Sequence, residues 1–442
     1  MKKSKLSVVM AAMVLVFTNA LAQEPEVNQA LLDASKAQQE ALIESLRDMV
    51  EIESGSDDIE GLERMARYTE ESLRALGAET QRITATNDVP PGLVKGVFKG
   101  SGTLKVALIA HMDTVYQPGI LELEPWRRDG NRIYGPGIAD DKGGIAVILH
   151  SLAILQDAGW DDYDTLTVQF NADEEIGSVG SGAIITELGS ENDVVLSYEP
   201  SPSKEVAGAE GVLLGTAGTA SLSLVVHGRA AHAGAAHEEG RNALIELAHQ
   251  LVQTRDIANS VPGSQLNWTS AQSGTARNQI PGLAEAGADV RITQKGAAEA
   301  LLEAVRTQTE KNLLIPDTYT AAELEVLRPM FEADERGRAL AELAESIYAE
   351  LGEGKLGQEN ARLMPTEGVV RRSLLLIPGT TGGTDAGFAA SSGKAAVLEG
   401  LGLAGWGYHA SHEHIEVDSI VPRLYLTTRM LEILGRNYSE AE

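Results

Sequence analysis

The sequence predicts an α/β protein: a mainly parallel sheet flanked by helices, with an inserted ferredoxin-like α+β domain. Through the first half of the chain, apolar runs of strand length alternate with amphipathic stretches of helix length. This alternation is typical of a parallel sheet covered by helices on both faces. From about Gly215 the order changes to strand, helix, strand, strand, helix, strand, which is the ferredoxin-like arrangement. A chain of 442 residues also exceeds what one hydrophobic core usually spans, which favours two domains.

The elements of the first domain follow from their apolar patterns. Buried strands are expected at KVALIAH (105–111), TLTVQF (165–170) and DVVLSYE (193–199). Helices are expected at MARYTEESLRALG (65–77) and at GGIAVILHSLAILQDAG (143–159), which ends at a glycine. A further helix (337–351), a glycine-rich turn (378–387), a strand (394–400) and a last helix (421–435) would complete this domain.

The insert is expected to have strands at 220–228, 266–274, 285–292 and 321–328, with helices at 241–256 and 297–314. We place this domain at 215–326, and we assign 23–214 and 327–442 to the first domain.

The N-terminus predicts a signal peptide over residues 1–22. Three lysines precede an uncharged apolar run over 6–17, and Ala20-Leu21-Ala22 forms an A-x-A cleavage pattern. A membrane anchor is the alternative, but the apolar run is shorter than the roughly 20 residues that a spanning helix needs. The mature protein is therefore expected to be secreted or periplasmic, cleaved after Ala22.

The composition excludes some partners and limits the chemistry. The chain has 64 acidic and 36 basic residues, a formal net charge of −28, which argues against nucleic acid and anionic membranes as partners. It has no cysteine, so any transition-metal site must use His, Asp and Glu.

Potential metal ligands follow three of the predicted strands. The first strand delivers His111, the second delivers Asp173, Glu174 and Glu175, and the third delivers Glu199. In an open α/β sheet the carboxyl ends of the strands form the ligand crevice, so these side chains are expected to converge. Adjacent acids are tolerable there if a divalent cation lies among them, because a bound ion is the largest local charge in a site.

Two further segments offer candidates. In GPGIADDKGG, one Asp is expected to cap the following helix; Asp141 would do so and leave Asp140 for a metal. In GYHASHEHIE, His409, His412 and His414 crowd together. His111 is expected to have a carboxylate partner in Asp113, because metal-bound histidines usually donate their second ring N–H to such a group and strand residues two apart share a face.

With these residues in place, the chain resembles the dinuclear zinc aminoacylase/carboxypeptidase family of metallopeptidases, and within it the glutamate carboxypeptidases. The resemblance rests on an ordered set of motifs across nearly the whole mature chain: HMDTVY, YGPGIADDKGG, NADEEIGSVGS, LSYEP, HGRAAHAGAA, NWT, ADVR, GGTDA and GLGLAGWGYH.

The resemblance implies two zinc ions per subunit and identifies the residues that bind each of them. Asp140 resembles the carboxylate that bridges both ions, with His111 and Glu199 on one ion and Glu175 and His409 on the other. The chain departs from the family pattern after this histidine, where it reads ASHEHIE, so His412 stays open as a substitute for His409. A cis peptide is implied at Asp140-Asp141.

The resemblance also assigns the remaining site residues. Glu174 resembles the general base and Asp113 the residue that orients His111. His232 is implied to reach the partner subunit's active site in a homodimer built through the insert, which makes 215–326 a dimerisation or lid domain. Three residues resemble those that grip the substrate's carboxylate end: Asn278, Arg291 and Arg328.

These features together predict an exported, zinc-dependent carboxypeptidase that hydrolyses the amide bond to a C-terminal amino acid. Glutamate is the expected residue, in N-acyl glutamates or folates. Two alternatives remain: an aminoacylase or dipeptidase of other specificity, and a non-catalytic exported binding protein. Glu174 favours an enzyme, because a binding protein needs no additional acid beside its ligands.

Overall fold

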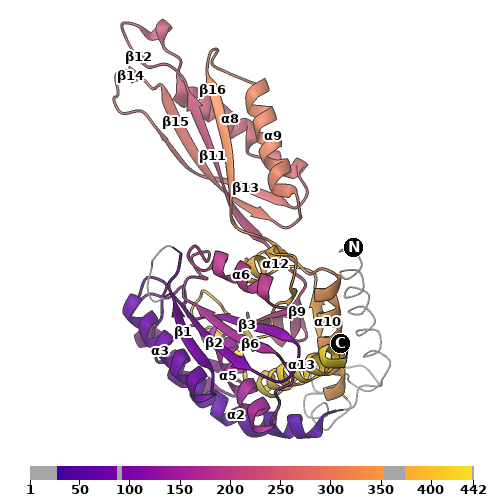
Figure 1. The fold of residues 1–442 in the computed structure, drawn as a ribbon. Coiled ribbons are helices and arrows are strands. Elements are labelled where there is room, and N and C mark those ends of the chain that lie inside the picture. Colours follow the sequence, from indigo (N-terminus) through magenta and orange to yellow (C-terminus); the bar gives the residue numbers. More distant parts are fainter. Residues whose placement is uncertain (1–26, 87–91, 353–373, 441–442) are drawn as a thin grey trace, which may run out of the picture. The chain divides into compact units, whose positions relative to one another are not determined.

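The computed structural model describes residues 27–86, 92–352 and 374–440 (Figure 1). The predicted signal peptide, 1–22, lies outside these residues. The described chain forms two units: the second comprises Gly215–Phe331 and Gly379–Gly387, and the rest forms the first. Within the described ranges, no helix combines the length and the apolar character needed to cross a membrane.

The main sheet of the first unit confirms the predicted fold class. Among the described residues six strands form it, in the order β1 (Glu79–Ile83), β2 (Leu93–Lys99), β6 (Thr165–Asn171), β3 (Lys105–His111), β7 (Val194–Ser197) and β19 (Ala396–Leu398). The strands from β6 to β19 run parallel, whereas β2, near one edge, is antiparallel to both of its neighbours, β1 and β6. The centre of the sheet is therefore parallel, and the carboxyl ends of β6, β3 and β7 meet at one side.

Helices cover both faces of this sheet. In Figure 1, α5 (Lys142–Asp157) and α6 (Gly182–Glu191) lie on opposite sides of β3, and both contact it. The other helices extend these layers: α2 (Gln29–Val50) and α13 (Ile420–Glu440) pack with α5, α3 (Ile59–Ala75) covers β1 and β2, and α10 (Glu335–Gly352) contacts β19. This double cover explains why nearly every residue of β3, β6 and β7 is buried, whichever face of the sheet it points to.

A second, smaller sheet in the first unit was not predicted. Five short strands of the described chain form it in the order β4 (Arg127–Asp129), β5 (Arg132–Tyr134), β21 (His414–Glu416), β20 (Ala404–Trp406) and β8 (Ser201–Pro202). None of these strands exceeds three residues, so none carries a readable periodicity. β20 and β21 pair antiparallel, which makes 407–413 a hairpin loop. Another short pair joins β9 (Gly211–Leu213) to β18 (Leu375–Ile377).

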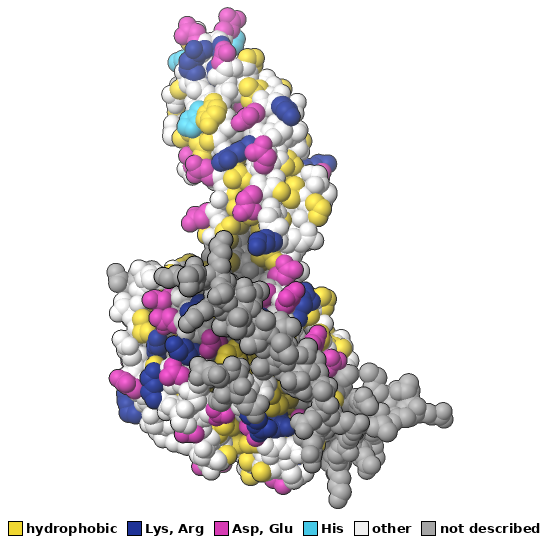
Figure 2. All heavy atoms as spheres, turned by 45° about the vertical axis from the view of Figure 1, so that its right-hand side comes forward, with side chains coloured by type: hydrophobic (Ala, Val, Ile, Leu, Met, Phe, Trp, Pro, Cys, Tyr) yellow, Lys and Arg dark blue, Asp and Glu magenta, His cyan; other side chains and the backbone are white. Residues whose placement is uncertain are grey.

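The second unit has the predicted ferredoxin-like order. Its sheet is β13 (Ser264–Ser273), β15 (Leu283–Ile292), β11 (Gly218–His227) and β16 (Tyr319–Arg328), with every neighbouring pair antiparallel. Side chains alternate along β11 and β15, and the buried ones form a core with α8 (Ala243–Thr254) and α9 (Ala297–Lys311). On the face of this unit that Figure 2 presents, Lys and Arg are interspersed with Asp and Glu.

The second unit is larger than the predicted insert of 215–326. The predicted end falls within β16, which continues to Arg328, and the unit itself extends to Phe331. The glycine-rich segment Gly379–Gly387, expected in the first domain, also belongs here, because its backbone pairs with the start of this unit. Ala217 N donates a hydrogen bond to Gly382 O over 2.8 Å.

His150 in α5 makes the stability of the first unit depend on pH. Gln38 Nε2 donates to its Nδ1 (2.8 Å), and its Nε2 lies 2.9 Å from Ser45 Oγ, so a neutral ring satisfies both contacts with α2. Burial lowers the pKa of His150 to about 4. The folded protein therefore binds a proton at His150 more weakly than the unfolded chain does. The stability that neutral His150 contributes is fully present above the unfolded pKa of about 6.5 and is lost as pH falls toward 4.

We predict that a His150→Gln variant loses less stability on acidification than the wild type. Between pH 7 and pH 4.5 the unfolding free energy of the wild type should fall by roughly 2 kcal/mol more than that of the variant. This follows from about 1.4 kcal/mol for each unit of pKa difference between the folded and unfolded states. Urea denaturation of both proteins at several pH values measures this difference. Parallel curves for the two proteins would contradict the assignment.

Candidate active site

The structure brings together five side chains that are far apart in the sequence. His111 is the last residue of β3, Glu175 follows β6 and Glu199 follows β7, so three ligand candidates come from neighbouring parallel strands. Asp140 lies directly before Asp141, which caps α5 by accepting a hydrogen bond from Gly144 N (3.2 Å). His409 comes from the hairpin loop between β20 and β21.

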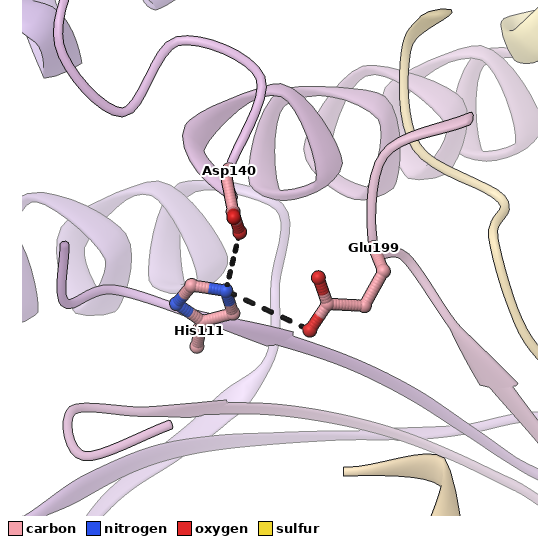
Figure 3. Close-up of side chains that lie close together, drawn as sticks. All are labelled: His111, Asp140 and Glu199. Carbon is pink, nitrogen blue, oxygen red and sulfur yellow. Dashed lines mark hydrogen bonds and ion pairs between the residues drawn. The ribbon is translucent and has the colours of Figure 1, made fainter. Parts of the chain in front are cut away.

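The first group of ligands consists of His111, Asp140 and Glu199 (Figure 3). His111 Nε2 lies 3.0 Å from Asp140 Oδ1 and 3.7 Å from Glu199 Oε1. Figure 3 shows the imidazole edge directed toward both carboxylates. One ion could therefore take one nitrogen and two oxygen ligands here, a donor set that suits zinc and similar transition metals.

The second group consists of Asp140, Glu175 and His409. His409 Nε2 lies 3.3 Å from Asp140 Oδ2 and 3.0 Å from Glu175 Oε2. Within each group the ligand atoms lie within 4.8 Å of one another. Asp140 thus directs one oxygen to each group, which is the arrangement that a carboxylate shared by two ions requires. The peptide bond between Asp140 and Asp141 is cis, as the resemblance implied.

His412 takes no part in either group. Its side chain is exposed, and its main-chain oxygen lies 3.1 Å from His414 Nδ1, where it can accept a hydrogen bond. His414 itself is buried against Tyr134, with ring centroids 5.2 Å apart. Of the three histidines in this segment, the structure places only His409 among the ligand candidates of the described residues.

Charge in the two groups is balanced between acids and histidines. Burial raises the pKa of Glu199 well above its usual range and also raises the pKa of Glu175. Burial would raise the pKa of Asp140 too, but hydrogen bonds from His111 and His409 outweigh it and hold that pKa below its usual range. Hydrogen bonds to Asp140 and Glu175 raise the pKa of His409 to about 10. Protonated histidines therefore offset the negative charge of these acids. Divalent cations bound at the same positions would offset it in their place.

Asp113 contacts His111, although for a different reason than expected. β3 ends at His111, so Asp113 lies beyond the strand and not on its face. His111 Nδ1 is 3.0 Å from the main-chain oxygen of Asp113 and 3.3 Å from its Oδ1. A proton donated from Nδ1 leaves the Nε2 lone pair for a metal.

The Asp113 carboxylate also fixes the acidic loop after β6. Its Oδ1 accepts a hydrogen bond from Glu174 N (3.1 Å), and its Oδ2 accepts one from Glu175 N (3.0 Å). Ser56 Oγ donates a third, over 2.9 Å. A single buried acid thus positions both a ligand candidate and its neighbour.

The three consecutive acids have different surroundings. Asp173 closes its own loop, because its carboxylate accepts hydrogen bonds from Gly180 N (2.6 Å), Ser181 N (3.1 Å) and Ser181 Oγ (2.5 Å). Glu175 belongs to the second ligand group. Glu174 is buried and belongs to neither group, but its charge raises the pKa of nearby Glu199. The structure therefore places a carboxylate beside the ligands that is not itself among them.

The other predicted residues lie in the second unit. His232 pairs with Gln279 where the short strands β12 (Ala231–His232) and β14 (Gln279–Ile280) meet, and Asn278 O accepts a hydrogen bond from Ala233 N (2.9 Å). His232 and Asn278 are thus neighbours on exposed chain segments.

The two arginines differ in exposure. Arg291, on β15, faces Asp289 with Nε 3.0 Å from Oδ1 and Nη2 3.3 Å from Oδ2. Arg328 is buried at the end of β16, beside Gly383 of the glycine-rich segment.

Sequence reasoning missed Glu413, a buried acid that contacts the turn before Asp140. Its hydrogen-bond partners are mainly backbone N–H groups. The sequence offers one signal for it: Glu413 is an acid that follows His409 closely. The histidines of the same segment are the more obvious candidates for metal ligands.

Comparison with known sequences assigns this site to a class of enzymes. The family model described as peptidase family M20/M25/M40 matches residues 107–433. The chain therefore belongs to this peptidase family, and it is a hydrolase of the metallo-exopeptidase class.

Among individual relatives, carboxypeptidase G2 from Pseudomonas sp. (strain RS-16) is 39% identical over 417 residues, which cover 94% of each chain. Two solved structures share the fold. Aminopeptidase PepT from Bacillus cereus has a TM-score of 0.68 at 20% identity and covers 90% of this chain and 98% of its own. The YXEP protein of Bacillus subtilis, described as a dinuclear metal-binding peptidase of the M20 family, has a TM-score of 0.61 at 17% identity, covering 90% and 99%.

Proposed function

We propose that the protein is an exported, zinc-dependent carboxypeptidase that releases a C-terminal glutamate from N-acyl glutamates or peptides. The observation that carries the proposal is the pair of ligand groups that share Asp140, with Glu174 beside them. The 39% identity to carboxypeptidase G2 over nearly the whole chain supports the carboxypeptidase activity and suggests the glutamate preference.

The described residues fit two divalent cations. Two histidine nitrogens and three carboxylates converge without any thiolate, and the shared acid offers a separate oxygen to each group. Bound zinc would polarise the substrate carbonyl and lower the pKa of water toward about 7. His111, Asp140 and Glu199 would hold one ion, and Asp140, Glu175 and His409 the other.

Glu174 is the proposed general base. It would accept a proton from the attacking water and pass it to the leaving amine, a contribution of roughly 10²–10⁴-fold. Its backbone position is set by the hydrogen bond from Glu174 N to Asp113. Asp113 would thus orient His111 and hold the base in place at the same time.

Asn278, Arg291 and Arg328 are the proposed contacts for the substrate's carboxylate end. The contacts of Arg291 support this role, because two of its N–H groups donate to the two carboxylate oxygens of Asp289, as they would to a substrate carboxylate. Both side chains are partly exposed, so a substrate carboxylate could share or replace this partner. Arg328 is buried and makes the least accessible contact of the three.

His232 is proposed to help hold the reacting carbonyl oxygen in the partner subunit's site. Its Nδ1 accepts hydrogen bonds from Gly234 N and Ala235 N, each over 3.1 Å. A neutral ring therefore carries its proton on Nε2, which is the donor that a carbonyl oxygen needs.

A homodimer follows from this role and is proposed to form through the insert. The exposed apolar side chains of α8 support it: Leu244, Ile245 and Val252 are 46%, 46% and 66% exposed. Sedimentation equilibrium of the purified protein would measure twice the subunit mass. A monomer at micromolar concentration would refute the proposal.

Export is proposed from the signal peptide at 1–22. The basic start, the short apolar run and the A-x-A pattern support it. N-terminal sequencing of the protein recovered from the periplasm or medium should find Gln23 first.

The proposed activity is tested with a panel of N-acyl amino acids, varying first the C-terminal residue and then the acyl group. We expect fastest release from N-acyl glutamates and loss of release after chelator treatment, with recovery on zinc addition. Faster release of an apolar amino acid would favour the aminoacylase or dipeptidase alternative. Absence of chelator-sensitive release from the whole panel would favour a binding protein.

Because Glu174 and Glu175 are proposed to have different tasks, we predict that their alanine variants differ in metal content. Glu174→Ala should keep two zinc ions per subunit and lose at least 10²-fold in kcat, because it removes only proton transfer. Glu175→Ala should lose zinc as well, because it removes a ligand of the second group. Metal analysis and kcat of both purified variants measure this contrast. Equal metal content and equal activity in the two variants would refute the assignment.

A further inference from the structure

We propose that Glu413 is a positioning residue that holds the Asp140 turn and the His409 loop in register. Through this role it would determine how tightly the second ligand group binds its ion. The inference rests on the proposed two-ion site, but it concerns a residue outside the ligands and the base.

Both carboxylate oxygens of Glu413 accept hydrogen bonds. The side chain is 2% exposed and accepts four hydrogen bonds in all. Ala139 N and Asp140 N donate to Oε1 over 2.8 and 3.0 Å, while Gly137 N and Tyr116 Oη donate to Oε2 over 2.9 and 2.7 Å. Three of these donors are the backbone of the turn that ends at the shared ligand.

Lys142 holds the other side of the same turn. Its Nζ donates to Pro136 O over 3.3 Å and to Ile52 O over 3.0 Å, and the side chain is buried. Carbonyl groups near the turn are thus held by the Lys142 ammonium group, and its N–H groups are held by the Glu413 carboxylate. Hydrogen bonds on both sides fix the path of the backbone that presents Asp140.

The two ligand groups depend on Glu413 to different extents. His111 and Glu199 come from the ends of β3 and β7, whose spacing is set by direct pairing of these strands. His409 comes from the hairpin loop 407–413, and Glu413, at the end of that loop, connects it to the Asp140 turn. Loss of this connection should therefore loosen the second group more than the first.

The Glu413→Gln variant isolates this effect. The amide has nearly the same volume, but its NH₂ group cannot accept the hydrogen bonds of the turn. Loss of outer partners of metal ligands typically weakens metal affinity 10–100-fold. We expect a loss of this size for the second ion and a smaller one for the first, because Asp140 belongs to both groups, whereas only the second includes His409 from the loop that ends at Glu413.

The test is a zinc titration of the full-length, metal-free protein against a competing chromophoric chelator. A His409→Ala variant, which lacks a ligand of the second group, gives the single-ion reference. Glu416→Gln is the matched control, because Glu416 is also buried and lies on β21, but it contacts Lys204 and not the Asp140 turn. This control should bind both ions with wild-type affinity.

Greater weakening of the second ion than of the first in Glu413→Gln supports the inference. Equal weakening of both ions, greater weakening of the first, or no weakening overturns it. If this variant does not fold, Glu413→Asp decides between these outcomes, because its shorter carboxylate keeps the charge but cannot reach every donor. A wild-type protein that binds fewer than two ions would instead refute the proposed function.

Discussion

The structure depends on how buried negative charge is compensated at one end of the main sheet. Asp140, Glu174 and Glu199 are buried or nearly so, and Glu175 lies with them beside two histidines. Such a group is costly unless cations or protons neutralise it. The raised pKa values of His409 and Glu199 reflect this cost. We therefore regard cation binding as the condition under which these acids can lie together and still perform different tasks.

The fold meets this condition by placing ligands on rigid elements and supporting them with backbone hydrogen bonds. Parallel strands deliver His111 and Glu199 at fixed spacing, and the start of α5 delivers Asp140. Two acids that hold no ion in the proposed site, Asp113 and Glu413, receive N–H groups from the loops that carry the ligands. We infer that the site owes its precision to these two acids, which bind backbone N–H groups and leave the proposed ligand carboxylates available for metal.

Much of this arrangement could be predicted from the sequence, for identifiable reasons. The apolar runs before His111, Asp173 and Glu199 are long enough to indicate strands, and parallel strands must bring their carboxyl ends together. The short sheet that includes β20 and β21 could not be predicted, because three-residue strands carry no periodicity. Glu413 was missed because most of its partners are backbone groups, which no residue pattern displays. Asp113 was correctly paired with His111 although the chain leaves the strand between them.

The proposed site requires that one carboxylate, Asp140, is shared by two cations. A crystal of the zinc-loaded protein, measured at the zinc absorption edge, tests this requirement directly. We expect two anomalous peaks per subunit, about 3.5–4 Å apart as in other two-metal sites, one on each side of Asp140. A single peak, or two peaks of which only one contacts Asp140, would contradict it.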